Sequence, residues 1–234
     1  MSTEASPWIG HLRKADGYAT GPYVLSELRR VIVSGQVRPG VSLPVDEIGA
    51  FFQVSRIPVR EALKTLIGEG LVRHQPRGGY TVTVLSGPEL HELYLVRGAL
   101  EAAAIEAATA AATPENDRRA TEIHRELLEA IDRDDVHRYQ ILSRSFHETL
   151  LAPCGMPRLL HMLSLVADLT EPSQAMSLLD ADQRAELQAD HTSMLEAFLR
   201  RDGAQLSAAA RSHHGRLTAY IDDARKSHGD ISAG

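Results

Sequence analysis

Val54-Ser-Arg-Ile-Pro-Val-Arg-Glu-Ala-Leu63 is the stretch of sequence that decides the fold of the first part of the chain. Ser55 is a favourable helix N-cap, and Pro58 fits a first helical turn because the amides of that turn have no acceptor within the helix. Apolar residues recur at helical spacing along one face, and they are Val59, Leu63, Leu66 and Ile67. The opposite face carries basic residues at intervals of four, and they are Arg56, Arg60 and Lys64. The sequence therefore predicts an amphipathic helix over residues 56–69 with one basic face.

The segments around this helix predict a small domain with a hairpin. The predicted elements are helices over 22–34, 46–52 and 56–69, followed by strands over 71–74 and 80–85. The two strands are joined by Gln75-Pro-Arg-Gly-Gly79, a turn with glycines at its tip. A short helix, a tight turn, a second helix and a glycine-tipped hairpin predict a winged helix-turn-helix domain over residues 17–85.

The basic helix face is suited to the major groove of DNA, where an arginine fork can pair with the O6 and N7 atoms of guanine. The glycines of the hairpin tip allow its backbone to approach a phosphate or the adjacent minor groove closely. A solvated helix face is the alternative interpretation of such a charge pattern, but the order of the elements favours DNA binding. The predicted DNA-contacting residues are Ser55, Arg56, Arg60, Lys64, Arg77, Gly78 and Gly79.

Three motifs carry a resemblance to a known family. Gly35-Gln-Val-Arg-Pro-Gly40, the stretch from Val54 to Leu63 and Glu69-Gly-Leu-Val72 resemble the GntR family of bacterial winged helix-turn-helix transcription regulators. The resemblance covers about residues 20–85 and implies DNA contacts at Ser55, Arg56, Arg60 and the hairpin tip. It departs from the family at Asp46, where a basic residue often makes a further contact, so that contact is not expected here.

Charge and composition divide the chain into two parts. The formal net charge is −6, which combines +3 over residues 1–85 with −9 over residues 86–234. This asymmetry predicts two domains with different partners. The single cysteine excludes an intramolecular disulfide framework. The sequence has no membrane-length apolar run and no apolar signal-peptide core near its start, which predicts a cytoplasmic protein. Residues 1–16 are polar and are expected to form a flexible arm.

After residue 86 the sequence predicts helices alone. The predicted helices cover residues 88–111, 114–132, 134–151, 157–170, 181–201 and 203–226, with breaks at proline and glycine. The predicted fold is therefore mainly α, with an N-terminal winged helix-turn-helix and a C-terminal antiparallel helical bundle over residues 86–234.

Histidines in the helical part predict a polar cluster inside the bundle. His191 and His213 lie eleven residues before and after position 202, so they are level across an antiparallel helical hairpin. Both follow the apolar spacing of their helices, whereas His214 is expected to face outward. His147 on another helix could complete a set of three imidazoles that holds a divalent transition metal. Three separate buried histidines with hydrogen-bond partners are the alternative.

The helical part also resembles the FCD effector domain of FadR-type GntR regulators, in its shorter, VanR-like form. The resemblance is carried by Val96-Arg-Gly-Ala-Leu-Glu101 and by Ser143-x-x-Phe-His147 together with His191 and His213. It implies zinc, nickel or manganese at the three histidines, with an aspartate that is Ser143 here. Two outcomes stay open, which are a metal held by three histidines plus an effector, and a metal-free site for an anion.

The resemblance further implies that Arg97 meets the carboxylate of an effector, with Tyr94 and Ser143 beside it. An ion pair of Arg97 with Glu101 or Glu92 is the alternative. The expected protein is a regulator and not an enzyme, most often a repressor, which binds a pseudo-palindromic operator as a homodimer and responds to a small organic acid. A hydrolase-like metalloenzyme and an effector-independent DNA-binding protein are the alternative functions.

Overall fold

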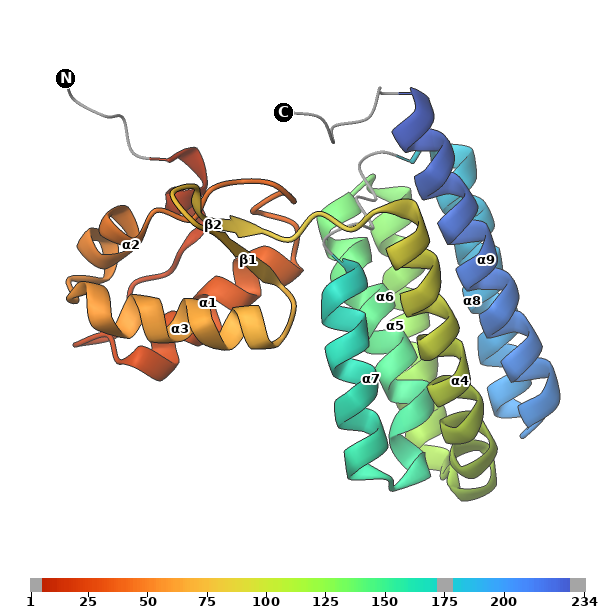
Figure 1. Ribbon diagram of the computed structural model, residues 1–234. Helices are drawn as coiled ribbons and strands as arrows, with labels where there is room; N and C mark the ends of the chain where they lie inside the picture. Colours follow the sequence, from red (N-terminus) through yellow and green to blue (C-terminus); the bar gives the residue numbers. More distant parts are fainter. Residues whose placement is uncertain (1–5, 172–178, 228–234) are drawn as a thin grey trace. The chain divides into compact units, whose positions relative to one another are not determined.

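The computed structural model describes residues 6–171 and 179–227, with side chains up to residue 224. The chain divides into two compact units, and the division falls between Leu85 and Ser86. In the described residues, the first unit holds three α-helices, a short 3-10 helix and a hairpin, and the second consists of helices (Figure 1).

The first unit is built on the helices α1 (Gly21–Val33), α2 (Val45–Phe52) and α3 (Arg56–Gly68). The turn between α2 and α3 is tight because Gln53 adopts the left-handed conformation, with φ of 56°. Gly49 is required beside it, since a Cβ at this position would lie 3.0 Å from the carbonyl oxygen of Val54. The core of the unit is formed by Val24, Leu28, Val31, Ile32, Ile48, Val59, Leu63 and Leu66. These contacts fix the direction of α3, whose basic face points away from the core.

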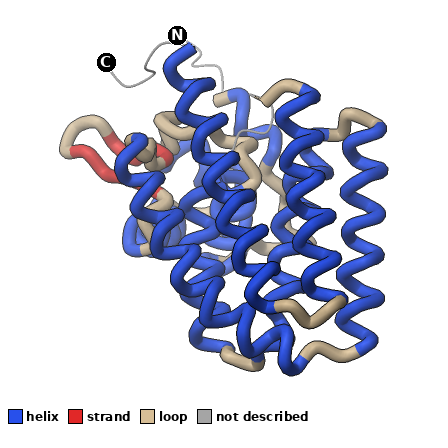
Figure 2. Tube along the Cα trace, turned by 90° about the vertical axis from the view of Figure 1, so that its right-hand side faces the viewer, coloured by secondary structure: helices blue, strands red, loops and turns tan. Residues whose placement is uncertain are grey.

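The hairpin consists of β1 (Val72–Gln75) and β2 (Gly79–Val82), which pair antiparallel with Val72 opposite Val82. It is the one sheet among the described residues and is drawn in red in Figure 2. Leu43 adds to its edge, because its amide donates to the carbonyl of Tyr80 at 2.8 Å. The second strand is shorter than the predicted 80–85, since its partner strand has four residues only.

The start of the chain differs from the expected flexible arm. Pro7–His11 form a 3-10 helix, and the side chains of Trp8, Ile9 and Leu12 are buried. The indole nitrogen of Trp8 donates to the carbonyl of Ser42 at 3.3 Å. The prediction of an arm is thus wrong for residues 6–12, because three apolar side chains in this polar segment pack on the first unit. Residues 1–5 lie outside the described residues.

The second unit is an antiparallel bundle. Its helices are α4 (Gly87–Ala111), α5 (Pro114–Asp132), α6 (Val136–Leu151), α7 (Pro157–Thr170), α8 (Ala181–Leu199) and α9 (Gly203–Ser227). Every predicted helix is present in the structure with ends within two residues of the prediction. Capping boxes start three of these helices, at Ser86, Thr113 and Asp180, and satisfy amides that the first turn leaves unpaired. A mainly helical fold with a small hairpin is therefore confirmed.

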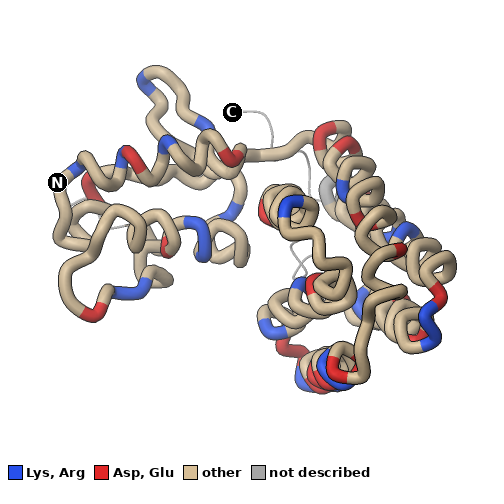
Figure 3. The backbone as a smooth tube through the Cα atoms, turned by 90° about the horizontal axis from the view of Figure 1, so that it is seen from below, with Lys and Arg blue, Asp and Glu red and all other residues tan. Residues whose placement is uncertain are grey.

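The packing order inside the bundle places α4, α6, α8 and α9 around a common interior. Helix α9 packs against both α8 and α4, while α6 packs against α5 and α4. Figure 3 shows Asp and Glu positions interspersed with Lys and Arg positions along the helices of this unit. Among the described residues, no helix is long and apolar enough to cross a membrane.

Candidate functional site

The basic face of α3 is exposed as predicted. Arg56, Arg60 and Lys64 all lie at the surface, and Ser55 before them makes no capping hydrogen bond with its hydroxyl. Nη2 of Arg56 donates to Oδ2 of Asp46 at 2.8 Å, and Nζ of Lys64 donates to Oε1 of Glu61 at 2.7 Å. The hydrogen bond to Glu61 raises the pKa of Lys64. The face therefore holds three cations, two of which have an acidic neighbour on the same unit.

The tip of the hairpin has an unusual backbone. Arg77 adopts the left-handed conformation with φ of 68°, in a turn closed by the amide of Gly78 and the carbonyl of Gln75 at 3.0 Å. A residue other than glycine in this conformation costs about 1–2 kcal/mol. Gly79 also has positive φ, at 80°, and a Cβ at Gly78 would lie 3.1 Å from the side chain of Gln75. The backbone thus presents the exposed Arg77 at the outermost point of the hairpin.

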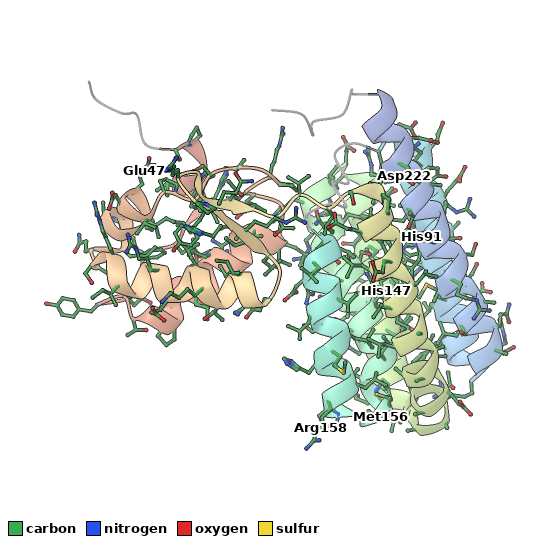
Figure 4. The ribbon with its side chains drawn as sticks, in the orientation of Figure 1. Glu47, His91, His147, Met156, Arg158 and Asp222 are labelled. Carbon is green, nitrogen blue, oxygen red and sulfur yellow. The ribbon has the colours of Figure 1, made fainter. Side chains whose placement is uncertain are left out.

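The three predicted histidines meet inside the second unit. His147 on α6, His191 on α8 and His213 on α9 are all buried, and His191 is 0% exposed. Their ring centres are 5.3 Å apart for His147 and His191, 5.1 Å for His147 and His213, and 4.6 Å for His191 and His213. One ring nitrogen of each lies within 4.8 Å of one ring nitrogen of both others. Figure 4 places His147 among the helices of this unit.

Hydrogen-bond partners orient the ring of His191. Its Nδ1 lies 3.2 Å from the hydroxyl of Tyr139 and 3.2 Å from Oε1 of Gln188. Its Nε2 lies 3.3 Å from the hydroxyl of Ser143, which therefore faces the cluster as the sequence predicts. Burial raises the pKa of Tyr139, so its hydroxyl stays protonated and can donate.

His213 lies near a carboxylate that the sequence analysis missed. Its Nδ1 lies 3.7 Å from Oδ2 of Asp190, which is beyond hydrogen-bond distance, and it has no hydrogen-bond partner among the described residues. Burial alone raises the pKa of Asp190, but the neighbouring His213 and Arg216 outweigh burial, so the pKa is lowered. Asp190 therefore carries negative charge next to the cluster.

His214 is buried, so the prediction that it faces outward is wrong. It is 6% exposed, and its Nδ1 lies 3.5 Å from Oε2 of Glu101 on α4. Its ring centre is 5.4 Å from that of Tyr94, and its Nε2 has no hydrogen-bond partner within the described part of the chain. The reason is that α9 packs against two helices, so two adjacent faces of α9 are covered.

Arg97 and Glu101 form a buried ion pair one helical turn apart. Nε of Arg97 donates to Oε1 of Glu101 at 2.9 Å, and the two residues are 6% and 4% exposed. The structure thus contains the ion pair considered for Arg97, and its acidic partner is Glu101. The pair stands beside His147 and His214 and brings a cation and a carboxylate to the edge of the histidine cluster.

The surroundings of His147, His191 and His214 favour their neutral form. Burial lowers the pKa of His147, His191 and His214 well below the ordinary value, and the neighbouring His213 lowers all three further. The charge of Arg97 adds to this effect at His147 and His214. Neutral imidazoles offer a lone pair each, and buried ring nitrogens without a partner are costly unless something binds them. The donor set therefore fits a divalent transition metal at His147, His191 and His213.

Comparison with known proteins adds a second line of information. The family model described as FCD domain matches residues 92–216, and the one described as bacterial regulatory proteins, gntR family, matches residues 23–82. Among curated relatives, the uncharacterized HTH-type transcriptional regulator BphR of Paraburkholderia xenovorans (strain LB400) is 27% identical over 192 residues, covering 80% of this chain and 78% of BphR. The HTH-type transcriptional repressor GlaR of Escherichia coli (strain K12) is 27% identical over 194 residues, covering 80% of this chain and 88% of GlaR.

A solved structure shares the fold. The chain is similar to E. coli McbR/YncC with a TM-score of 0.79 and 21% identity, over 88% of this chain and 98% of that protein. The matching families and relatives are transcription regulators and not enzymes. The metalloenzyme interpretation of the histidine cluster is therefore excluded, and the expectation of a regulator is confirmed.

Proposed function

Since the chain belongs to the GntR family of bacterial transcription regulators and carries an FCD domain, we propose that it is a ligand-responsive regulator that binds operator DNA as a homodimer. The observation that carries the proposal is the pairing of two features. One compact unit presents an exposed basic helix face, and the other encloses a polar cluster of histidines with a buried arginine. The first feature suits DNA and the second suits a small anion.

In this proposal residues 17–85 read the operator. Helix α3 enters the major groove with its first turn at the base edges, where Arg56 and Arg60 reach guanine and Ser55 and Lys64 meet phosphate or base. The left-handed backbone at Arg77 supports a DNA contact of the hairpin, because strained residues are retained where they serve a function. Operator binding takes place in the cytoplasm.

Residues 86–234 in this proposal bind the effector and form the dimer. Arg97, Tyr94 and Ser143 meet a small carboxylate, which gains a charge-assisted hydrogen bond from the guanidinium. His147, His191 and His213 hold zinc, nickel or manganese in the metal-assisted form, where the bound ion supplies a positive centre for the carboxylate. In the metal-free form the same carboxylate is held by Arg97 and by donors of the imidazole rings.

The effector acts by shifting the placement of two DNA-binding units in a dimer. A homodimer meets a pseudo-palindromic operator with half-sites about one helical turn apart. An effector changes DNA affinity only to the extent that it binds the two arrangements with different affinity. Relatives named as repressors support repression as the output.

An effector-independent DNA-binding protein is the weaker alternative. A bundle without a ligand would bury Nδ1 of His213 and Nε2 of His214 with no hydrogen-bond partner among the described residues. Each such group destabilises the fold by about 1–3 kcal/mol. A ligand that reaches these atoms removes this cost, and this favours the effector-binding interpretation.

The DNA-binding part is tested with an operator selected from random-sequence duplexes. We expect Arg60→Ala to lower operator affinity by about fivefold to 150-fold, because a good guanine contact is worth about 1–3 kcal/mol. Arg118→Ala removes an exposed arginine of α5 and is the control. Unchanged operator affinity of folded Arg60→Ala in a gel-shift titration contradicts the assignment.

The effector part is tested by a thermal-shift screen of organic acids, with elemental analysis of the native protein. Stabilisation by an acid that disappears with chelator supports the metal-assisted form. Stabilisation of a metal-free protein that ignores chelator supports the metal-free form. No response to any acid contradicts the effector site.

A further inference from the structure

Two sets of three ligand-type side chains meet inside the second unit, and both contain His147. One set is His147 with His191 and His213, and the other is His147 with Glu101 and His214. In each set, one nitrogen or oxygen of every member lies within 4.8 Å of those of the other two. All of these side chains are buried. The second set was not foreseen from the sequence, because His214 was expected at the surface.

The second set contains the carboxylate that the first set lacks. Ser143 contributes a neutral hydroxyl to the three-histidine set. In the second set Oε1 of Glu101 is engaged by Arg97, while Oε2 faces His214 at 3.5 Å. A carboxylate oxygen adds negative charge, which an arrangement of neutral imidazoles cannot supply.

His214 has the burial and the unpaired ring nitrogen that a metal ligand needs. It is buried, with 6% exposure, and its Nε2 has no hydrogen-bond partner among the described residues. A neutral imidazole keeps one nitrogen free to coordinate a metal.

We propose that Glu101, His147 and His214 form a second cation site, distinct from the three-histidine site and occupied in alternation with it. The alternation follows from His147, since a neutral imidazole has one lone pair and cannot serve two ions at once. The mixed oxygen and nitrogen donors favour a harder ion such as Mn²⁺, whereas three imidazoles favour Zn²⁺ or Ni²⁺. This inference concerns metal binding alone and does not depend on DNA binding.

Arg97 controls this second site. Its guanidinium holds Oε1 of Glu101 and places a positive charge beside the cation position. The carboxylate of a bound effector that paired with Arg97 would release Glu101 from its ion pair, and Glu101 could then coordinate the metal. The anion and the second cation would therefore each bind more tightly when the other is bound. Such coupling is reciprocal by thermodynamic necessity.

The experiment isolates the second site by removing the first. Metal-stripped His191→Ala/His213→Ala protein is titrated with Mn²⁺, and the free ion is followed by its electron paramagnetic resonance signal. We expect one Mn²⁺ per chain to bind. In the same background Arg97→Gln should raise Mn²⁺ affinity several-fold, because it removes a neighbouring positive charge. Arg97→Gln with Glu101→Gln should lower it at least roughly tenfold relative to Arg97→Gln alone.

Arg97→Gln alone leaves Glu101 buried without its partner, so the test has to separate metal affinity from folding. Arg97→Gln with Glu101→Gln removes both charges of a buried pair, so neither charge is left without its partner. Circular dichroism and a cooperative thermal transition establish that each variant is folded. A folded His191→Ala/His213→Ala protein that binds no Mn²⁺ overturns the proposal. Equal affinity of the variants with Glu101 and with Gln at that position also overturns it.

A second inference comes from an apolar residue on the basic face of α3. Ile57 is 72% exposed in the first turn of the helix, next to Arg56 and three residues before Arg60. The core of this unit is reached by Val59 and Leu63 from the other side of the helix. Ile57 is a stiff, β-branched side chain in the first turn of α3. The proposed function places this turn against the base edges of DNA.

We infer that Ile57 reads the 5-methyl group of a thymine in the operator. The methyl group is the apolar feature of the major groove, and apolar side chains recognise it by direct contact. Burial of Ile57 against it removes apolar surface from water on both partners. The inference rests on the proposed function and names a further specificity-determining residue.

Deoxyuridine substitution tests this contact, because uracil is thymine without the methyl group. Each thymine of the selected operator is replaced in turn, and affinity is measured for the unaltered protein and for Ile57→Ala. We expect one position per half-site where the loss of the methyl lowers affinity by roughly threefold to tenfold, and Ile57→Ala should be insensitive there. Ile67→Ala, on the far end of the same helix, should keep the full sensitivity.

Two failures are distinguishable. Absence of any selected operator refutes the proposed function. An operator that binds tightly but shows no uracil-sensitive position, or the same sensitivity in Ile57→Ala, refutes the thymine contact alone.

Discussion

Asp46 at the start of α2 accepts a hydrogen bond of 2.8 Å from Arg56 at the start of α3. Both side chains are about two-thirds exposed, at 66% and 65%, so this pair contributes little to stability. Its effect is on charge, because a carboxylate lies next to a cation of the proposed DNA-reading face. We predict that Asp46→Asn strengthens binding to any DNA sequence and makes the slope of log K against log salt more negative by about one.

The measurement is a salt titration of binding to the operator and to unrelated duplex. Asp132→Asn changes the net charge equally on the second unit and serves as the control. An unchanged slope would show that Asp46 lies outside the DNA interface.

Because Arg77 has a left-handed backbone, its replacement should affect protein stability and DNA affinity differently. Asparagine tolerates this conformation better than arginine does, so Arg77→Asn should leave the free energy of unfolding unchanged or raise it by up to about 1 kcal/mol. The same substitution should weaken DNA binding and reduce the salt slope by about one phosphate contact. Urea denaturation and gel-shift titration on one preparation check both effects, and a parallel loss of stability would contradict the account of strain.

Arg201 ties the α8–α9 turn to the start of α5. Its guanidinium donates to both carboxylate oxygens of Asp117 at 2.8 Å and to the carbonyl of Phe198 at 2.9 Å. These partners raise the pKa of Arg201, and both side chains of the pair stay partly exposed. After discounting for solvent, we expect Arg201→Ala to lower the free energy of unfolding by about 1–2 kcal/mol. Arg118→Ala, at an exposed pair of α5, should change it by less than about 0.5 kcal/mol in the same urea titration.

The buried histidines predict an acid-sensitive bundle in metal-stripped protein. Folding lowers the pKa of His147, His191 and His214, so the folded state binds fewer protons than the unfolded state below about pH 6.5. Their contribution is therefore complete above about pH 6.5 and is lost as the pH falls, by up to about 1.4 kcal/mol per pH unit for each histidine.

Urea midpoints at about pH 7.5 and about pH 5.5 with chelator measure this loss. His214→Gln should reduce the difference between the two midpoints, whereas His161→Gln on the exposed side of α7 should not. Equal midpoints at both pH values would contradict neutral buried histidines.

The helices were predictable because their signals are local. Capping residues such as Ser86 and Asp180 act within one turn of the helix they start. The meeting of His191 and His213 was also predictable, since an antiparallel hairpin makes positions level when they are equally far from its turn. The segment around Trp8 was missed because its three apolar residues lie in a short, otherwise polar stretch, and their burial depends on tertiary contacts with the rest of the unit.

The rest of the cluster depends on how separate helices pack. No sequence spacing relates Glu101 on α4 to His214 on α9, and only the double packing of α9 brings them together. Asp190 was missed for another reason, because attention to the histidines passed over the carboxylate that directly precedes His191 and faces His213 on the neighbouring helix. The spacing of apolar residues predicts one buried face for each helix. It therefore does not identify residues on a second buried face, such as that of His214 on α9.

The complete burial of His191 has a consequence in time. Any ion or acid that reaches the cluster has to pass between packed helices, so its entry and exit wait for the bundle to open. Openings of this kind take from microseconds to seconds, and a coordinated ligand is released more slowly still. In the proposed function, occupancy of the cluster therefore averages over changes in ligand concentration that are faster than this opening.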